Sequence, residues 1–296
     1  MTTQNYDVII IGAGAAGLMC AAEAGRRGRR VWVVEHANKL GKKILMSGGG
    51  RCNFTNLHPS PENFLSGNPH FCRSALARYT QWDFIAMVQA HGIAYHEKEL
   101  GQLFCDQSSK QILAMLVTEC QAVNVRLSTG TSVSSVRATQ PGFELQTTAG
   151  TVRCERLVIA TGGLSIPKMG ASGFGYDLAR QFGHSVVSTR AGLVPLTLSG
   201  RPLEQIDGLA GVATPVVAQT PEQSFSNAAL VTHRGLSGPA VLQISSYWQP
   251  GTPLHMNWLP GIDAAQQLLE AKRTRPQTRL ESLLQEFLPK QLAIRL

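Results

Sequence analysis

The chain has 296 residues, with 27 lysines and arginines against 19 aspartates and glutamates, which gives a formal net charge of +8. This length suggests roughly two domains at about 150 residues each, and both can bury a core. Charged residues make up 16% and hydrophobic residues 43% of the chain, a balance that excludes a largely disordered protein.

Positive charge gathers in three places, at residues 26–30, 39–43 and 272–279. A basic balance would suit polyanions, so RNA, a membrane surface and phosphorylated cofactors all have to be considered. We interpret the three clusters as solvated faces and helix-end charges rather than as a nucleic-acid groove. Nucleic acid is therefore disfavoured as a partner.

Six cysteines are spread along the chain without a CxxC or CxxxxC pair. We expect no secretory leader, because the apolar stretch at 8–19 lacks a basic flank and is broken by glycines. No run approaches the roughly 18 apolar residues that a membrane span needs. These features predict a reduced, cytoplasmic protein without a membrane span, and they leave its oligomeric state open.

The start of the chain has the pattern of a β-α-β unit. Residues 6–11 form a continuous apolar run, which is typical of a parallel strand buried on both faces. A helix of small residues is expected over 15–27, and strand-forming residues return at 31–34.

A glycine motif lies between that strand and that helix, with the sequence GAGAAG at 12–17. Its glycines can make the tight turn, admit a pyrophosphate and let strand and helix pack closely. An acid follows the second strand, where it can bind ribose hydroxyls and would repel a 2′-phosphate, which favours FAD or NAD over NADP. The candidate dinucleotide contacts of this unit are Gly12, Ala13, Gly14, Ala15, Ala16, Gly17 and Glu35.

The middle of the chain mixes loops, helices and short strands. Residues 41–56 are glycine-dense and are expected to form a loop. A capping box at Thr80–Asp83 predicts a helix that ends at Gly92, and a second helix is expected over 111–122. The apolar period then changes to two, which predicts strands at 125–127, 132–137, 143–147 and 152–154.

This strand cluster favours FAD over NAD as the cofactor. An NAD dehydrogenase domain would continue in alternating strands and helices, whereas here an apolar strand at 157–159 follows the cluster and enters the turn ATGG at 160–163. The arrangement resembles the two-dinucleotide-binding-domain flavoproteins, in which such a strand returns to the FAD sheet.

Beyond residue 192 the chain changes to proline-punctuated short strands, at 193–198, 212–218 and 254–258, and it becomes helical from about 263. We therefore predict an α/β fold with a Rossmann-type FAD-binding domain at 1–190. A β-rich inserted domain is expected at 191–296, ending in a partial helical segment.

Three longer motifs narrow the resemblance to one family. They are GKKILMSGGGRCNFTN at 41–56, TGGLS at 161–165 and THRGLSGPA at 232–240. Together they resemble the bacterial YhiN/BaiN-type NAD(P)/FAD-dependent oxidoreductases over essentially the whole chain. Members of that family run on to a stretch that completes the flavin site, so the resemblance implies a chain truncated at its C-terminus.

The resemblance also implies which residues lie against FAD. The family's SGGGRCN loop contacts the cofactor, and backbone amides with an arginine suit a pyrophosphate or a reduced flavin. Arg51 could instead form a structural ion pair, and Val133, whose position commonly contacts adenine, could be a core valine. Cys52 is interpreted as a packing residue, because no partner cysteine lies at redox spacing. The further candidate FAD contacts are Lys43, Ser47, Gly48, Gly49, Arg51, Asn53, Val133, Ala160, Thr161 and Gly162.

The activity that the resemblance implies is hydride transfer from NAD(P)H through FAD to an unknown organic acceptor. Some relatives are linked to bile-acid ring reduction. Two alternatives stay open: a flavoprotein that modifies tRNA, which the basic balance would suit, and a truncated fragment that binds nucleotide without turnover. His233 and Arg234 could face substrate or cap a loop. The sequence identifies no catalytic residue and no metal-ligand cluster.

Overall fold

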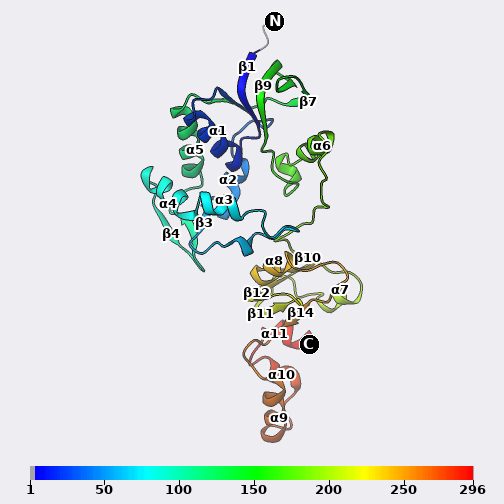
Figure 1. Cartoon of the computed structure of the whole chain (residues 1–296). Coiled ribbons are helices and arrows are strands. Elements are labelled where there is room, and N and C mark those ends of the chain that lie inside the picture. Colours follow the sequence, from blue (N-terminus) through cyan, green and yellow to red (C-terminus); the bar gives the residue numbers. More distant parts are fainter. Residues whose placement is uncertain (1–3, 296) are drawn as a thin grey trace. The chain divides into compact units, whose positions relative to one another are not determined.

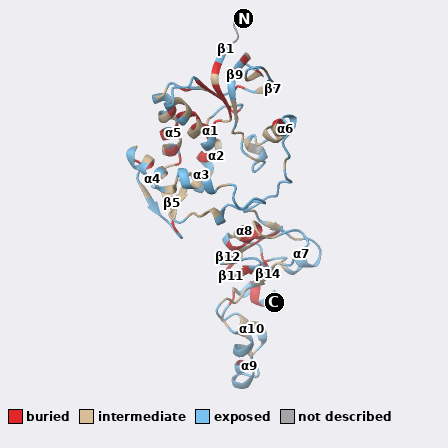
Figure 2. Ribbon diagram, viewed as in Figure 1, coloured by how far each residue is buried: buried red, intermediate tan, exposed pale blue. Residues whose placement is uncertain are grey.

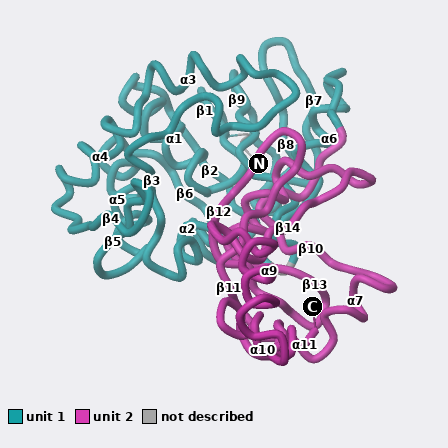
Figure 3. The backbone as a smooth tube through the Cα atoms, turned by 90° about the horizontal axis from the view of Figure 1, so that it is seen from below, with its two compact units in different colours: residues 1–187 teal, residues 188–296 magenta. Residues whose placement is uncertain are grey.

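The computed structural model describes residues 4–295 and divides the chain into two compact units, Met1–Val187 and Ser188–Leu296 (Figure 3). The division falls close to the expected one after residue 190. We refer to the two parts as unit 1 and unit 2.

Unit 1 is built on a six-stranded sheet with the strand order β6-β2-β1-β9-β8-β7. Strands β1, β9 and β7 of this sheet are labelled in Figure 1. The strands β6, β2, β1 and β9 are parallel to one another. Strand β8 pairs antiparallel to β9, and β7 pairs antiparallel to β8. The apolar strand expected at 157–159 does return to β1, where Ile9 pairs with Leu157 and Ile11 with Ile159. The strands are β1 Gln4–Ile11, β2 Val31–Val34, β6 Arg126–Ser128, β7 Val133–Ala138, β8 Phe143–Thr147 and β9 Gly150–Ile159.

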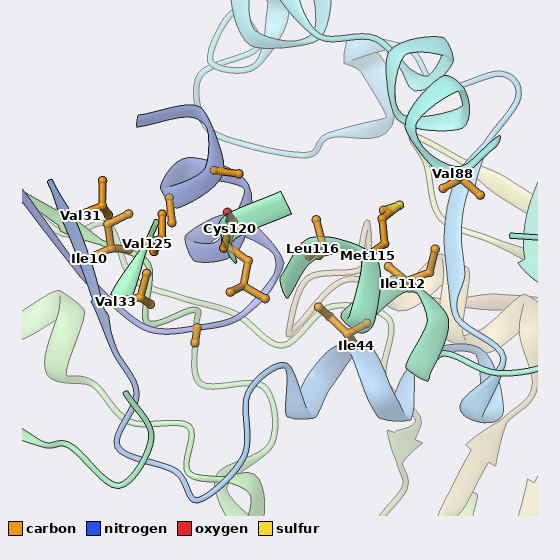
Figure 4. Packing of buried hydrophobic residues seen from close by; sticks show 14 of the residues in the cluster. Ile10, Val31, Val33, Ile44, Val88, Ile112, Met115, Leu116, Cys120 and Val125 are labelled. Carbon is orange, nitrogen blue, oxygen red and sulfur yellow. Dashed lines mark hydrogen bonds between the residues drawn. The ribbon is translucent and has the colours of Figure 1, made fainter. Parts of the chain in front are cut away.

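Alternate residues of β1 face two separate cores, which explains its continuous apolar sequence. Ile10 belongs to the core cluster that includes buried residues of helices α1 (Ala15–Arg26) and α5 (Lys110–Ala122), among them Leu116 of α5 (Figure 4). The thiol of Cys120 on α5 donates a hydrogen bond to the carbonyl of Leu18 at 3.3 Å. The two helices are therefore joined over one face of the sheet.

The opposite face of β1 carries Ile9, which packs with Trp32 and Leu145 in a second cluster. Helix α6 (Phe174–Gln181) adds Leu178 to this cluster. Buried residues consequently run through the centre of unit 1 on both sides of the sheet (Figure 2).

Residues 41–56 are more ordered than the expected loop. They form helix α2 (Lys42–Met46), a 3-10 turn (Ser47–Gly50) and strand β3 (Asn53–Asn56). The glycines of the turn adopt positive φ angles, +56° at Gly48, so their high content permits a compact turn instead of flexibility.

Strand β3 belongs to a second, three-stranded sheet in unit 1 with the order β3-β5-β4. The predicted capping box is confirmed, since Thr80 and Asp83 bond reciprocally at the start of α4 (Gln81–Ala90). The remaining elements here are β4 Tyr95–Glu97, β5 Gln102–Cys105, α3 Arg73–Arg78 and the 3-10 turns Pro61–Asn63 and Pro167–Met169.

Unit 2 contains a five-stranded antiparallel sheet with the order β10-β13-β12-β11-β14. The strands predicted at 193–198, 212–218 and 254–258 overlap β10, β11 and β14. Strands β12 and β13 were not predicted, and the mixed run SFSNAALVT of β12 lacks strict alternation. The strands are β10 Leu196–Thr197, β11 Ala213–Gln219, β12 Ser224–Thr232, β13 Gly235–Ser237 and β14 His255–Asn257.

Helices complete the core of unit 2. Ile244 of α8 is fully buried with Val216 of β11 and Val231 of β12, and Leu292 of α11 joins the same cluster. The helices are α7 Arg201–Gln205, α8 Pro239–Ser245, α9 Ala264–Thr274, α10 Leu280–Leu284 and α11 Lys290–Arg295.

None of the helices formed by residues 4–295 has the length and apolar character needed to cross a lipid bilayer.

Substituting Ile10→Ala should lower the free energy of unfolding by about 2–5 kcal/mol, because a fully buried side chain would leave a cavity in the sheet. The measurement is urea denaturation followed by circular dichroism. Val187→Ala is the control: its side chain is 84% exposed, and a change within about 0.5 kcal/mol is expected. Equal losses in the two variants would contradict this account of the core.

Candidate functional site

A cavity of about 660 Å³ opens in unit 1 beside the turn that joins β1 to α1. It lies at the carboxyl end of the parallel strands, where open α/β sheets bind their ligands. Twelve of the candidate contacts line it: Gly12, Ala13, Gly14, Ala15, Ala16, Glu35, Lys43, Ser47, Asn53, Ala160, Thr161 and Gly162.

Two glycines of the turn are required by the protein itself. Gly12 has φ +107°, and a Cβ there would overlap the carbonyl of Ala160. A Cβ on Gly17 would overlap the carbonyl of Gly12, so Gly17 lies behind the turn and lines neither cavity described here. The absence of a side chain at these two positions allows β1, α1 and the end of β9 to approach closely.

Gly14 differs from these two, because an added Cβ would meet no protein atom within 4 Å and its φ is −84°. Gly14 precedes helix α1, whose first turn has no acidic residue and no side-chain cap. Free N–H groups and the positive end of the helix dipole therefore face the cavity. This open cradle fits a pyrophosphate, which needs a close backbone approach.

Glu35 lines the cavity, and its side chain is only 12% exposed. Its Oε2 accepts a hydrogen bond from the amide of Ala13, and its Oε1 accepts one from the amide of Ala37, both at 2.9 Å. The Nδ1 of His36 lies 3.2 Å from Oε1. A carboxylate has about four acceptor positions, so Glu35 can still accept ribose hydroxyls.

A second cavity of about 440 Å³ shares Gly12, Glu35 and Thr161 with the first. Val133 of β7 lines it, next to Ser132, so the predicted adenine contact lies at the second cavity. Two adjoining cavities that meet at one acid suit a ligand with two halves.

Positive charge lines the first cavity at Lys39, Lys42 and Lys43. The Nζ of Lys43 donates to the carbonyl of Gly163 at 3.3 Å. No ion pair formed within residues 4–295 includes any of the three lysines. The cavity wall therefore favours an anion.

Three further candidates, Gly48, Gly49 and Arg51, lie outside both cavities. A Cβ on Gly48 would stand 2.6 Å from the amide of Asn53, so packing already explains this glycine. Contact between these residues and a cofactor stays a prediction.

Sequence reasoning missed several lining residues. Gly170 and Ala171 line both cavities, and Phe54 and Phe84 line the first. None of them belongs to a glycine fingerprint, and the aromatic pair comes from different elements. Proximity in sequence could have suggested His36, which follows Glu35, and Phe54, which follows Asn53.

Cys52 lines the first cavity and is also buried in the core with Cys105. Burial raises the pKa of the Cys52 thiol, although a hydrogen bond with Ser47 opposes the shift. Burial also raises the pKa of Cys105 to about 11. Neutral, buried thiols fit a packing role better than a reactive one.

The parallel sheet, the glycine turn and the acid after β2 define a Rossmann-type dinucleotide-binding protein. The description "HI0933-like protein Rossmann domain" matches residues 6–230, and "HI0933-like protein barrel and H2TH domain" matches residues 190–296. The chain belongs to this HI0933-like family of flavin-dependent oxidoreductases. The resemblance to YhiN/BaiN-type proteins is thereby confirmed.

Two relatives share the name ribosomal RNA dihydrouridine synthase. The Escherichia coli K12 protein is 56% identical over 294 residues, which cover 99% of this chain and 74% of the relative. The Haemophilus influenzae protein is 48% identical over 296 residues, covering 98% and 73%. A 3-dehydro-bile acid delta(4,6)-reductase of Clostridium scindens is 28% identical over 270 residues, covering 87% and 65%.

The two glycines of the turn should respond differently to alanine. Gly12→Ala should lower the free energy of unfolding by about 3 kcal/mol or more, because of its positive φ and the overlap with Ala160. Gly14→Ala should cost less than about 1 kcal/mol but weaken FAD binding at least about tenfold, since its methyl group would fill the cradle.

Urea denaturation and FAD titration by flavin fluorescence measure these two effects. Unchanged FAD affinity in Gly14→Ala would overturn the assignment of the cradle.

Stability should fall at alkaline pH through the buried thiols. Burial raises the pKa of Cys105, Cys120 and Cys154 to about 11 from an ordinary value of 9.0. The folded state holds the protonated form, so the stabilisation is complete below pH 9 and is lost as pH rises towards 11. Urea midpoints compared between pH 8.5 and pH 10.5 test this, and Cys154→Ala should show a smaller loss.

Proposed function

We propose that this protein is an FAD-dependent reductase that uses NAD(P)H to convert a uridine of ribosomal RNA into dihydrouridine. The observation that carries the proposal is the cavity of about 660 Å³ at the glycine turn, in a chain 56% identical to a ribosomal RNA dihydrouridine synthase. The cavity supplies the cofactor site, and the relative's name supplies the acceptor.

The residues at the two cavities fit FAD. Free amides at Ala15 and Ala16 would receive the pyrophosphate, Glu35 would accept ribose hydroxyls, and the backbone at Val133 would contact adenine. When bound, FAD supplies the two-electron chemistry that side chains lack, taking up a hydride and passing it on. The lysines lining the first cavity would compensate negative charge on the cofactor.

The proposed reaction balances as one hydride and one proton added across a carbon–carbon double bond. In uridine this is the C5–C6 bond, which is conjugated to the C4 carbonyl, so the ring accepts hydride as an enone does. The electron pair comes from NAD(P)H, which leaves as NAD(P)⁺. The name of the bile-acid relative also denotes a reductase acting on ring double bonds.

One part of the cavity wall is apolar. Phe54 and Phe84 lie there with Met19, Ile112 and Leu116 of the two covering helices. Apolar walls exclude water and so protect a hydride donor from side reactions. They also suit a flat ring system, whether it belongs to the cofactor or to the base.

The sequence alone disfavoured nucleic acid as a partner, and the proposed RNA substrate replaces that prediction. Scattered charge argued against a nucleic-acid groove, but two relatives that cover nearly the whole chain carry a name with an RNA substrate. The net charge of +8 then assists encounter with a polyanion. Ribosomal RNA and NAD(P)H also fit the expected cytoplasmic location.

The proposal predicts that the chain loaded with FAD and given NADPH or NADH forms dihydrouridine in ribosomal RNA from cells that lack this protein. Nuclease digestion and mass spectrometry would detect the gain of two hydrogens. We expect bleaching of the flavin spectrum by the nicotinamide under anaerobic conditions and reoxidation when the RNA is added. Gly14→Ala should lose both signals in proportion to its lost FAD.

Two alternative hydride acceptors are tested separately in the same assay. Transfer RNA tests the alternative RNA substrate, and a 3-oxo-Δ4,6 steroid tests the small-molecule reading. Reoxidation by the steroid or by transfer RNA but not by ribosomal RNA would overturn the proposed substrate. A chain that binds FAD but is never reduced by NADH or NADPH would overturn the proposed donor.

A further inference from the structure

The segment from the end of α9 to the start of α10, residues 272–279, carries the densest positive charge of unit 2, and we call this segment the connection. Residues 272–279 read KRTRPQTR, with four cations and no acid. Residues 188–296 contain nine lysines and arginines against seven aspartates and glutamates, so the rest of the unit has five cations and seven acids. The positive excess of unit 2 is therefore confined to this connection.

All four cations are exposed, yet the connection itself is held in place. Arg275 binds the carboxylate of Glu286 through its two terminal guanidinium nitrogens, at 2.6 and 3.3 Å. The amide of Thr278 donates to the carbonyl of Arg275 at 3.0 Å. One arginine thus ties the connection to the chain beyond α10, and the other cations stay free to bind a ligand.

Few acidic side chains compensate the positive charge of the other three cations. Lys272 and Arg273 form no ion pair within residues 4–295, and Arg279 lies 3.7 Å from Glu281 with its side chain 83% exposed. The negative end of the α9 dipole accounts for two of them in its last turn. It does not account for Arg279, which precedes α10 at the end where a helix dipole disfavours a cation.

The other side chains of the connection identify the kind of partner. Thr274, Gln277 and Thr278 stand between the cations, and these residue types join Lys and Arg in binding the phosphates and sugars of nucleic acids. Amphipathic segments that insert into a membrane surface carry aromatic or leucine anchors beside their cations, and 272–279 contains none.

We propose that residues 272–279 of unit 2 bind the phosphodiester backbone of RNA. The inference rests on the proposed function, for which this connection anchors the large substrate while the reaction takes place in unit 1. Contacts to phosphates orient an RNA without reading its sequence, so selection of the uridine belongs to other residues.

The test compares two triple variants of the full chain that remove equal charge. Lys272→Gln, Arg273→Gln and Arg279→Gln alter the connection. Arg190→Gln, Arg201→Gln and Lys290→Gln alter other exposed cations of unit 2, none of which forms an ion pair within the described chain. The probe is protein-free bacterial ribosomal RNA, bound at several salt concentrations, and circular dichroism checks that both variants fold.

We expect the connection variant to lose at least about tenfold in affinity near 0.15 M salt and to flatten the log–log salt dependence by about 2–3, as three lost phosphate contacts require. The control variant should stay within about threefold of the parent, as expected when no phosphate contact is lost. Equal losses in both variants would mean that net charge alone acts, and no loss in either would mean that the connection does not bind RNA; both results overturn the inference.

Two further outcomes separate this inference from the proposed function. If the parent binds RNA and forms dihydrouridine while the connection variant retains full affinity, the inference fails and the proposed function stands. If the parent does not bind RNA at all, both fail. Loss of binding to vesicles containing anionic lipid, with RNA binding intact, would assign the connection to a membrane instead.

Discussion

The close approach of β1, α1 and β9 at the glycine turn is the constraint on which the rest of unit 1 depends. Gly12 and Gly17 have no space for a side chain, because the carbonyls of Ala160 and Gly12 occupy it. This contact sets the end of β1 against the end of β9, and it directs the free amides of α1 into the cavity. A larger residue there would separate the elements that form both sides of the site.

Where the two cavities adjoin, one acid is surrounded by hydrogen-bond donors. Glu35 is held by the amides of Ala13 and Ala37, and its own backbone bonds to Ser128 and Thr131. The acid therefore connects the glycine turn, the edge of the parallel sheet and the segment before β7. Both cavities include this residue in their lining.

Local patterns in the sequence predicted the β-α-β unit, the capping box and the returning strand, because each depends on neighbouring residues or on a period of two or 3.6. They did not predict α2 and β3, since the glycines at 48–50 look like a flexible loop until their positive φ angles are known. Phe84 and Gly170 reach the cavity only through tertiary packing, which has no local signal. Strand β12 was missed because its two faces are not cleanly separated into polar and apolar residues.

Strand β9 is a single strand of ten residues that takes part in two kinds of pairing. Residues 150–154 pair with β8 and residues 152–159 pair with β1, and Ala160 follows directly at the glycine turn. The strand carrying Val133 is joined through β8 to the same β9. Both ends of a two-part ligand would thus contact a surface that is already ordered in the folded protein. The entropic cost of ordering this surface falls on folding, so ligand binding does not carry it. Disrupting the pairing of β9 with either β1 or β8 should therefore weaken binding of the whole ligand.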